Sequence, residues 1–170
     1  MQFEIIRIAR AEDAGPLHPL IGAYFDWVVP PFNAQNGLSI DAAEVARRTL
    51  DGLDGFLPPD GAIAMGRDAE GAAVGMVFVH RIRPDACEVK RLFVLPRTRG
   101  SGLGRALIRE ATEAAREMGA RALYLDTTAF MEAAHRLYRA EGFVEVEPYP
   151  ESEHSDAQAG HVLFMKRDLA

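Results

Sequence analysis

The sequence predicts an α/β fold in which a mixed sheet carries helices on both faces. In the middle of the chain an apolar, strand-like run, residues 89–95, ends in a glycine-rich turn, and a helix-like stretch and a further strand, residues 122–126, follow it. A strand, a helix and a strand in this order place the two strands parallel. Pairs of strand-like segments on either side of this unit predict antiparallel hairpins, so we expect a mixed sheet.

The amino-terminal part predicts a strand and a long helix. Residues 3–9 alternate between apolar and polar side chains, which is typical of a strand, and residues 13–28 carry apolar side chains at helical spacing. We expect Pro30 and Pro31 to end this helix, because a proline lacks the N–H group that a helix interior needs. Residues 33–37 then predict a turn-rich loop.

A second helix and a hairpin are expected next. Ser39 or Asp41 is suited to cap a helix that runs to residue 50, since either side chain can accept a hydrogen bond from the first free N–H groups. Residues 62–67 and 72–82 are apolar runs separated by Asp-Ala-Glu-Gly, which predicts a β-hairpin.

The second half of the chain completes the sheet. The helix that follows the glycine-rich turn has the most regular apolar stripe of the sequence, and Gly119 is suited to end it in a left-handed conformation. Together with the strands above, the remaining segments give about seven strands; they are a strand at 122–126, a helix at 131–140, and strands at 143–146 and 162–166.

Composition and charge exclude several classes of protein. The 170 residues suffice for a single domain, 1–170, with an ample core, and the amino terminus does not have the pattern of a signal peptide. A net charge of −6 argues against nucleic-acid binding, and no apolar run approaches the ~20 residues of a membrane span. Cys87 is the sole cysteine, and the five histidines lack ligand spacing. We therefore expect a cytoplasmic protein without a disulfide or a metal site.

The turn Arg-Gly-Ser-Gly-Leu-Gly, residues 99–104, predicts a phosphate site. A glycine-rich turn between a strand and a helix directs free N–H groups and the positive end of the helix dipole at one spot. A Walker loop is excluded because no lysine follows the glycines, and a Rossmann turn is excluded because Arg105 stands where the third glycine belongs. Four arginines and no acid between residues 97 and 109 favour a compact polyanion as the ligand.

Three segments resemble those of the GNAT superfamily of acetyl-CoA-dependent N-acetyltransferases. The pattern Arg-x-x-Gly-x-Gly in the turn resembles the pyrophosphate-binding signature of that family. Residues 88–94 resemble its fourth strand, and residues 134–143 resemble its Ala-x-x-Leu-Tyr-x-x-x-Gly-Phe segment. The resemblance implies a mostly antiparallel, twisted sheet that splays open between its fourth and fifth strands.

Acetyl-CoA as co-substrate is what the resemblance implies for the ligand. The backbone of Leu92, Phe93 and Val94 would pair with the pantetheine arm of the coenzyme in the manner of an added strand. The pyrophosphate would lie against the turn, whose implied binding residues are Arg99, Gly100, Ser101, Gly102, Leu103, Gly104 and Arg105.

The resemblance also implies catalytic roles. Tyr138 matches the tyrosine whose hydroxyl donates a proton to the departing thiolate, and Glu88 occupies a position that part of the family uses for the base. Other members place the base where Asp126 stands, and an ordered water is a third option. Each residue also has a structural interpretation, in which Glu88 pairs with an arginine, Asp126 caps a turn and Tyr138 packs in the core. The chain departs from the family at Met131, where many members carry an asparagine that contacts the coenzyme.

The function implied is transfer of an acetyl group from acetyl-CoA to a primary amine of a small molecule or peptide in a direct ternary complex. The alternative from another class is a non-catalytic module that senses acyl-CoA. The identity of the amine stays open: the acidic segment 147–156 either faces a cationic acceptor or is only solvated. The oligomeric state is open too, and a homodimer through a sheet edge or a helix face is compatible with the sequence.

Overall fold

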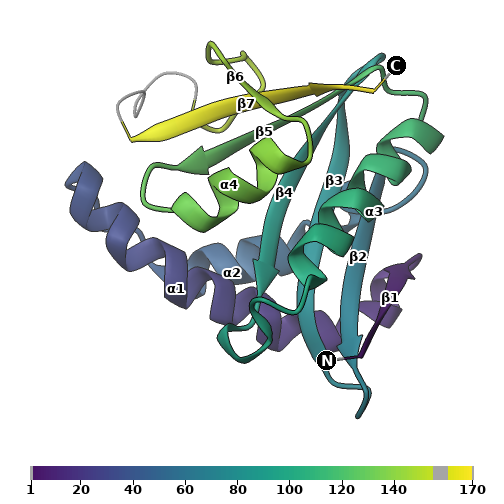
Figure 1. Ribbon diagram of the computed structural model, residues 1–170. Helices are drawn as coiled ribbons and strands as arrows, with labels where there is room; N and C mark the ends of the chain where they lie inside the picture. The colour runs from purple at the N-terminus through teal and green to yellow at the C-terminus, as the bar shows by residue number, and fades with distance from the viewer. Residues whose placement is uncertain (1, 155–160, 170) are drawn as a thin grey trace.

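Residues 2–154 and 161–169 are described by a computed structural model, and they form one seven-stranded sheet with the strand order β1-β2-β3-β4-β5-β7-β6 (Figure 1). Neighbouring strands are antiparallel except for the parallel pair β4 and β5. The prediction of a mixed, mostly antiparallel sheet is thus confirmed. The strands are β1 (Phe3–Ile8), β2 (Gly61–Asp68), β3 (Ala73–Arg83), β4 (Ala86–Val94), β5 (Ala122–Thr128), β6 (Val144–Val146) and β7 (Val162–Asp168).

Helices cover both faces of the sheet (Figure 1). On β2, Ile63 and Met65 pack toward α1, whereas Ala64 between them packs toward α3. Because both faces are buried, the central strands are continuous apolar runs instead of alternating ones. The helices are α1 (His18–Asn36), α2 (Ala42–Asp51), α3 (Leu103–Glu117) and α4 (Glu132–Ala140), with short 3-10 turns at Ala11–Leu17, Leu53–Phe56 and Pro96–Thr98.

The sheet opens between β4 and β5. Their ladder begins at Ala86 opposite Ala122 and stops at Val89 opposite Leu125, so the rest of each strand diverges from the other (Figure 1). On its other side β4 carries a bulge: the register with β3 shifts between the pairs formed by Lys90 and Phe93. The expected splay between the fourth and fifth strands is therefore confirmed. Among the described residues, no strand pairs with the β5 side of β4 beyond Val89.

Helix α1 differs from the sequence prediction. It continues through Pro30 and Pro31 and ends only at Gly37, which has the left-handed φ of 63°. The two prolines leave the carbonyl groups of Asp26 and Trp27 without intrahelical donors. Both of these residues are exposed, so water can satisfy their carbonyls, while buried Val28, Val29 and Phe32 hold the helix against the core. The predicted loop at 33–37 is wrong for the same reason.

Helix α3 packs unusually close to the sheet because two glycines face each other beneath it. Gly66 on β2 pairs with Gly75 on β3, and a Cβ on Gly66 would lie 2.6 Å from a methyl carbon of Leu103. A Cβ on Gly75 would lie 3.0 Å from the same side chain. The start of α3, and with it the glycine-rich turn, is thereby held against the middle of the sheet.

Other local predictions hold. Asp41 caps α2, because its Oδ1 accepts hydrogen bonds from the N–H groups of Ala43 and Glu44. Gly119 follows α3 with φ 79°, and Cys87 is a buried thiol on β4. Of the acidic segment 147–156, the last two positions lie outside the described residues. Over the described ranges, no helix has both the length and the apolar character needed to cross a bilayer.

Candidate active site

The glycine-rich turn has the geometry of an anion site. Gly100 and Gly102 adopt left-handed φ angles of 80° and 89°, and Gly102 is the N-cap of α3. Within residues 2–154 and 161–169, the N–H groups of Gly100, Gly102, Gly104 and Arg105 find no acceptor. The space outside the turn is open, since a Cβ on Gly100 or Gly102 would meet no atom within 4 Å. This concave set of free donors at a helix start suits a pyrophosphate.

The positive charge around the turn is smaller than the sequence alone suggests. Arg105 and Arg109 both pair with buried Glu141, at 3.1 and 2.9 Å, and Arg97 lies 3.6 Å from a carboxylate oxygen of Asp68. Arg99 has no carboxylate partner in the described part of the chain, and its guanidinium lies 5.2 Å from the centre of the Trp27 ring. Arg99 is therefore the arginine of this group that remains available to a bound anion.

A cavity of about 400 Å³, which we call the turn-side cavity, extends from the turn along β4 toward α4. Four of the predicted residues are not part of its lining: Ser101, Gly102, Leu103 and Arg105. The Ser101 hydroxyl donates to the carbonyl of Thr98 at 2.7 Å, and the Leu103 side chain is buried in the core. The predicted residues that do line it are Leu92, Phe93, Val94, Arg99, Gly100 and Gly104, and it is closed by Trp27, Phe130, Met131 and Leu137.

Trp27 and Phe130 were not singled out by the sequence. Trp27 lies 5.9 Å from the Phe93 ring and 6.3 Å from the Phe130 ring, centre to centre. Its 38% exposure is high for a tryptophan. This exposure is visible only in the structure, and no pattern in the sequence singles out Trp27 as a site residue. Met131, where the family often has asparagine, makes this end of the cavity apolar.

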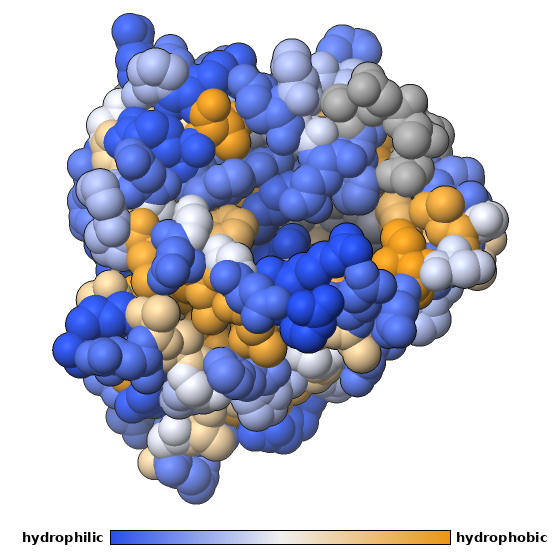
Figure 2. Space-filling view, turned by 180° about the vertical axis from the view of Figure 1, so that it is seen from behind, coloured by the Kyte–Doolittle hydropathy of each residue, from blue (hydrophilic) through white to orange (hydrophobic). Residues whose placement is uncertain are grey.

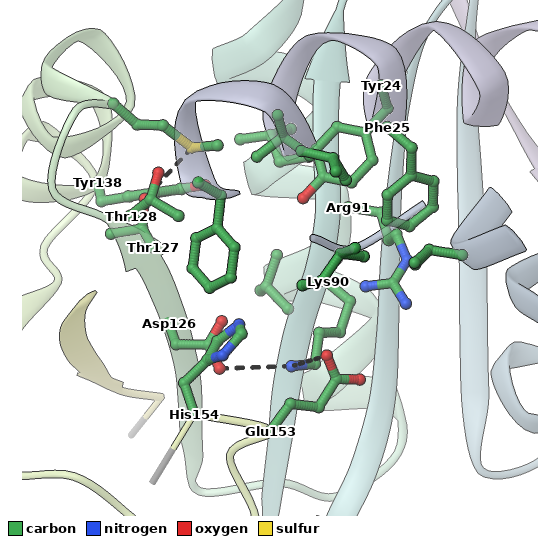
Figure 3. A pocket seen from close by; sticks show the side chains of 18 residues that line it. Tyr24, Phe25, Lys90, Arg91, Asp126, Thr127, Thr128, Tyr138, Glu153 and His154 are labelled. Atoms are coloured by element: carbon green, nitrogen blue, oxygen red, sulfur yellow. Dashed lines mark hydrogen bonds and ion pairs between the residues drawn. The ribbon is translucent and has the colours of Figure 1, made fainter. Parts of the chain in front are cut away.

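A second cavity of about 210 Å³, which we call the helix-side pocket, lies between α1 and the opening of the sheet (Figure 3). It shares Leu92 and Met131 with the turn-side cavity, so the two meet at the place where β4 and β5 separate. On the face opposite that of Figure 1, hydrophobic patches lie around a central hollow in a largely hydrophilic surface (Figure 2). The apolar wall of the helix-side pocket comes from α1 and consists of Tyr24, Phe25, Val28, Val29 and Phe32.

Tyr138 reaches the helix-side pocket from α4 (Figure 3). Its side chain is 6% exposed and packs on Phe143, and its hydroxyl forms no hydrogen bond within the described ranges. Burial raises the pKa of Tyr138, and the nearby Tyr24 and Asp126 raise it further. Burial also raises the pKa of Tyr24. Both hydroxyls therefore keep their protons at neutral pH, which a proton donor requires.

Glu88 lies behind the pocket and not in its lining. It is 1% exposed, and both of its carboxylate oxygens have partners. The hydroxyl of Tyr149 donates to Oε1 at 2.6 Å, and Lys90 Nζ lies 3.2 Å from the same oxygen. Oε2 lies 2.8 Å from Nε2 of His80. Within the part of the chain that the structure describes, the partners of Glu88 are thus His80, Lys90 and Tyr149 and not an arginine.

Asp126 does face the helix-side pocket. It is the first residue of β5 beyond the ladder with β4, and its Oδ2 accepts a hydrogen bond from the Ser152 hydroxyl at 2.6 Å. Lys90 Nζ, on the facing strand, lies 3.4 Å from the same oxygen. Asp126 therefore brings a carboxylate into the helix-side pocket.

Lys90 is a site residue that the sequence prediction missed. Burial lowers the pKa of Lys90, but the carboxylates of Asp126, Glu88 and Glu153 outweigh this effect, so its pKa is raised. Lys90 is consequently a cation that holds three acids together. The available signal was its spacing of two residues from Glu88, which places both side chains on one face of a strand.

Comparisons with known proteins agree with this geometry. Residues 23–143 match the model of the acetyltransferase (GNAT) family. An uncharacterized N-acetyltransferase of Schizosaccharomyces pombe is 33% identical over 126 residues, which are 74% of this chain and 77% of the relative. The uncharacterized N-acetyltransferase YjgM of Escherichia coli is 35% identical over 124 residues, which are 71% of this chain and 74% of the relative.

Solved structures share the fold. A GNAT-family acetyltransferase of Staphylococcus aureus has a TM-score of 0.74 at 18% identity, covering 99% of this chain and 100% of its own. The PaiA N-acetyltransferase of Thermoplasma acidophilum, solved in complex with coenzyme A, has a TM-score of 0.71 at 17% identity, covering 99% of both chains. At these identities the structures show the fold alone. Since the family model spans most of the sequence and both relatives exceed 30% identity over more than two thirds of it, this chain belongs to the acetyltransferase (GNAT) family and is an acyltransferase.

Proposed function

We propose that this protein transfers the acetyl group of acetyl-CoA to the amine of a small molecule within a ternary complex. The observation that carries the proposal is the meeting of two cavities at the opening between β4 and β5. One starts at a turn with free N–H groups, and the other contains the carboxylate of Asp126. The Thermoplasma relative with coenzyme A and a Salmonella typhimurium relative with acetyl-CoA support the choice of donor.

The turn-side cavity is the proposed donor site. In the described part of the chain, no strand pairs with the backbone of Leu92, Phe93 and Val94 on its β5 side. The free backbone groups suit the amides of a pantetheine arm, which would bind there as an added strand does. The N–H groups of the turn suit the pyrophosphate, with Arg99 beside them. Met131 gives the arm an apolar contact in place of the amide contact that an asparagine would make.

The helix-side pocket is the proposed acceptor site, and Asp126 is the proposed proton acceptor. An alkylamine has a pKa near ~10.4 and arrives mostly as an ammonium, which must lose a proton before it can attack. Asp126 lines this pocket, whereas Glu88 lies behind it and is held by three neighbours. Glu88 as the base stays a prediction; the contacts favour a role in which Glu88 positions Lys90 and, through Lys90, Asp126.

Two residues carry the proton transfers of the proposed reaction. Asp126 takes the first proton of the ammonium, and the free amine attacks the thioester carbonyl, so that a C–N bond forms and the C–S bond breaks. Tyr138 gives its hydroxyl proton to the departing thiolate, and the tyrosinate takes the second proton from the nitrogen. The products are the N-acetylated amine and the free thiol of coenzyme A, and the proton on Asp126 passes to solvent.

A screen of acceptors tests the proposal. Purified protein with acetyl-CoA is offered amines, polyamines, amino acids, aminoglycosides and peptides, while thiol release and the acetylated product are measured by absorbance and mass spectrometry. We expect amine-dependent thiol release above the rate without acceptor. If acetyl-CoA binds by calorimetry and no amine in the panel is acetylated, the proposal is wrong and a role as an acyl-CoA sensor replaces it.

A further inference from the structure

Arg91 is a cation of the helix-side pocket that no carboxylate of the described residues neutralises. Within the described ranges it forms no ion pair, and its Nε is buried without a hydrogen-bond partner. Its guanidinium lies 5.1 Å from the centre of the Phe25 ring, a contact that leaves the planar N–H groups without acceptors. A buried guanidinium N–H that lacks an acceptor is costly, so an acceptor from a ligand would be favourable.

Lys90, the preceding residue, is in the opposite situation. Three carboxylates lie within 3.8 Å of its Nζ, those of Glu88, Asp126 and Glu153. Three acids around one lysine leave this side of the pocket with a formal excess of negative charge. Figure 3 shows Asp126 and Arg91 on opposite sides of the pocket. The pocket is therefore acidic toward β5 and basic at Arg91.

The backbone of β4 is distorted at this position. Arg91 has a φ of 57°, and it is the one residue other than glycine with a positive φ among the described residues. In a regular strand Lys90 and Arg91 would point to opposite faces, but both line the helix-side pocket. The bulge that shifts the register with β3 is what brings both cations to one side. A left-handed φ is unfavourable for a residue with a Cβ, and the surrounding sheet holds Arg91 in this conformation.

From these observations we infer that the acceptor carries an anionic group as well as its amine, and that it is a small amino carboxylate with an apolar side chain. This inference rests on the proposed function. The ammonium would lie at Asp126, the carboxylate would accept hydrogen bonds from Arg91, and the apolar side chain would lie against Phe25 and Val28 of α1. A guanidinium binds a carboxylate through two parallel hydrogen bonds, so Arg91 sets specificity by a group that does not react.

The test compares matched acceptors in the wild-type protein. For leucine, methionine and phenylalanine, kcat/KM is measured for the amino acid and for the amine that lacks only the carboxylate. We expect at least one amino acid to exceed its amine by about 10–100-fold, mainly through a lower KM. If every amine equals or exceeds its amino acid, the inference is wrong although the protein is an acetyltransferase. If no amine of any kind is acetylated, the proposed function itself fails.

Two substitutions assign the preference to Arg91. Arg91→Met keeps a non-glycine residue at the positive φ but removes the charge, and the ratio of the two kcat/KM values should fall toward 1. Arg91→Lys keeps the charge but lacks the planar guanidinium, and it should give an intermediate ratio. This variant still tests the role of Arg91 if Arg91→Met does not fold. The control Arg47→Met, on the exposed side of α2, should keep the wild-type ratio. A preference that persists in Arg91→Met and Arg91→Lys would overturn the role of Arg91.

Discussion

At the scale of single residues, the ammonium of Lys90 compensates the negative charges of the site. Its ammonium joins Glu88, which is buried behind the pocket, to Asp126, which faces into it. A buried carboxylate without a cation is strongly unfavourable, so the lysine allows two acids to lie side by side at the opening of the sheet. Because a ligand in the helix-side pocket can reach Asp126 but not Glu88, we expect the two carboxylates to have different roles.

The first prediction concerns Tyr138. In Tyr138→Phe the ring and its packing on Phe143 remain, while the hydroxyl proton is lost. The affinity for acetyl-CoA measured by calorimetry should stay within a few-fold of wild type, and kcat should fall by roughly 10²–10⁴ if proton donation is rate-limiting. The loss should be smaller with an acyl donor whose thiol leaves without protonation. Equal rates of variant and wild type with every donor would make Tyr138 a packing residue.

The second prediction separates the two acids. Asp126→Asn should lower kcat/KM by about 10²–10⁴ at neutral pH, and the loss should shrink as the pH rises, since more of the acceptor is then already a free amine. Glu88→Gln should cause a smaller loss with little recovery at high pH, because it acts on the position of Lys90. The readout is the pH profile of kcat/KM for both variants. The reverse pattern, with recovery only in Glu88→Gln, would make Glu88 the base.

At the scale of elements, close packing of α3 and the length of α1 build the two cavities. Because Gly66 and Gly75 lack a Cβ, the Leu103 side chain packs directly against the sheet. This contact fixes the start of α3 and the turn before it. Helix α1 continues past Pro30, and Phe32 from this continuation belongs to the wall of the helix-side pocket. Each cavity therefore depends on a helix end whose position is set by contacts with distant strands.

The third prediction tests the glycine pair. Gly66→Ala should lower the free energy of unfolding by about 1–3 kcal/mol, because its Cβ would overlap the buried Leu103 side chain. The matched control Gly22→Ala lies in α1 with no atom near its new Cβ, and it should raise stability by about 0.5–1 kcal/mol. Urea denaturation measures both.

A double mutant assigns the cause. Leu103→Ala removes the methyl groups that the new Cβ of Gly66→Ala would meet. The combined variant should therefore be more stable than the sum of the two single effects predicts, by at least about 0.5 kcal/mol. Simple additivity of the two effects would show that the cost of Gly66→Ala does not come from this contact.

At the scale of the whole molecule, the proposed donor site joins parts of the chain that are separate in sequence. The turn-side cavity is lined by α1, β4, the start of α3 and α4. A ligand that fills it links these elements in the folded state and has no comparable site in the unfolded chain. Ligand binding should therefore appear as an increase in global stability.

The fourth prediction is thermal stabilisation by coenzyme A. At 100 times its Kd the ligand should add about 2.7 kcal/mol to the free energy of unfolding, which corresponds to roughly 5–10 °C in Tm for a chain of this size. Gly102→Asp should lose this shift, because a negative side chain would lie at the proposed pyrophosphate site. Gly71→Asp is the matched control: its φ of 82° and open surroundings give similar strain and the same charge away from the site.

Differential scanning fluorimetry with and without coenzyme A decides the point. The Gly71→Asp variant should show a lower Tm than wild type but the full ligand-induced shift. A full shift in Gly102→Asp would remove the turn as the phosphate site.

The sequence by itself determined the succession of strands and helices along most of the chain and the parallel step around the glycine-rich turn, and it predicted an anion site at the start of α3. These features depend on side chains that are near one another in the chain: apolar periodicity, a cap such as Asp41, and glycines within six positions of each other. Backbone conformation at this range is set by local sterics and hydrogen bonds, and so a single sequence carries the information.

Only the tertiary structure decided which polar side chains meet. Asp126 and Lys90 are 36 residues apart, and Tyr149 and Glu88 are 61 apart, so no local pattern pairs them. Pro30 indicated the end of a helix, but burial of its neighbours against the sheet outweighed the lost hydrogen bond. The bulge that turns Arg91 into the pocket likewise arises from strand pairing. In each case the deciding free energy comes from packing between distant segments, which the periodicity of one segment does not contain.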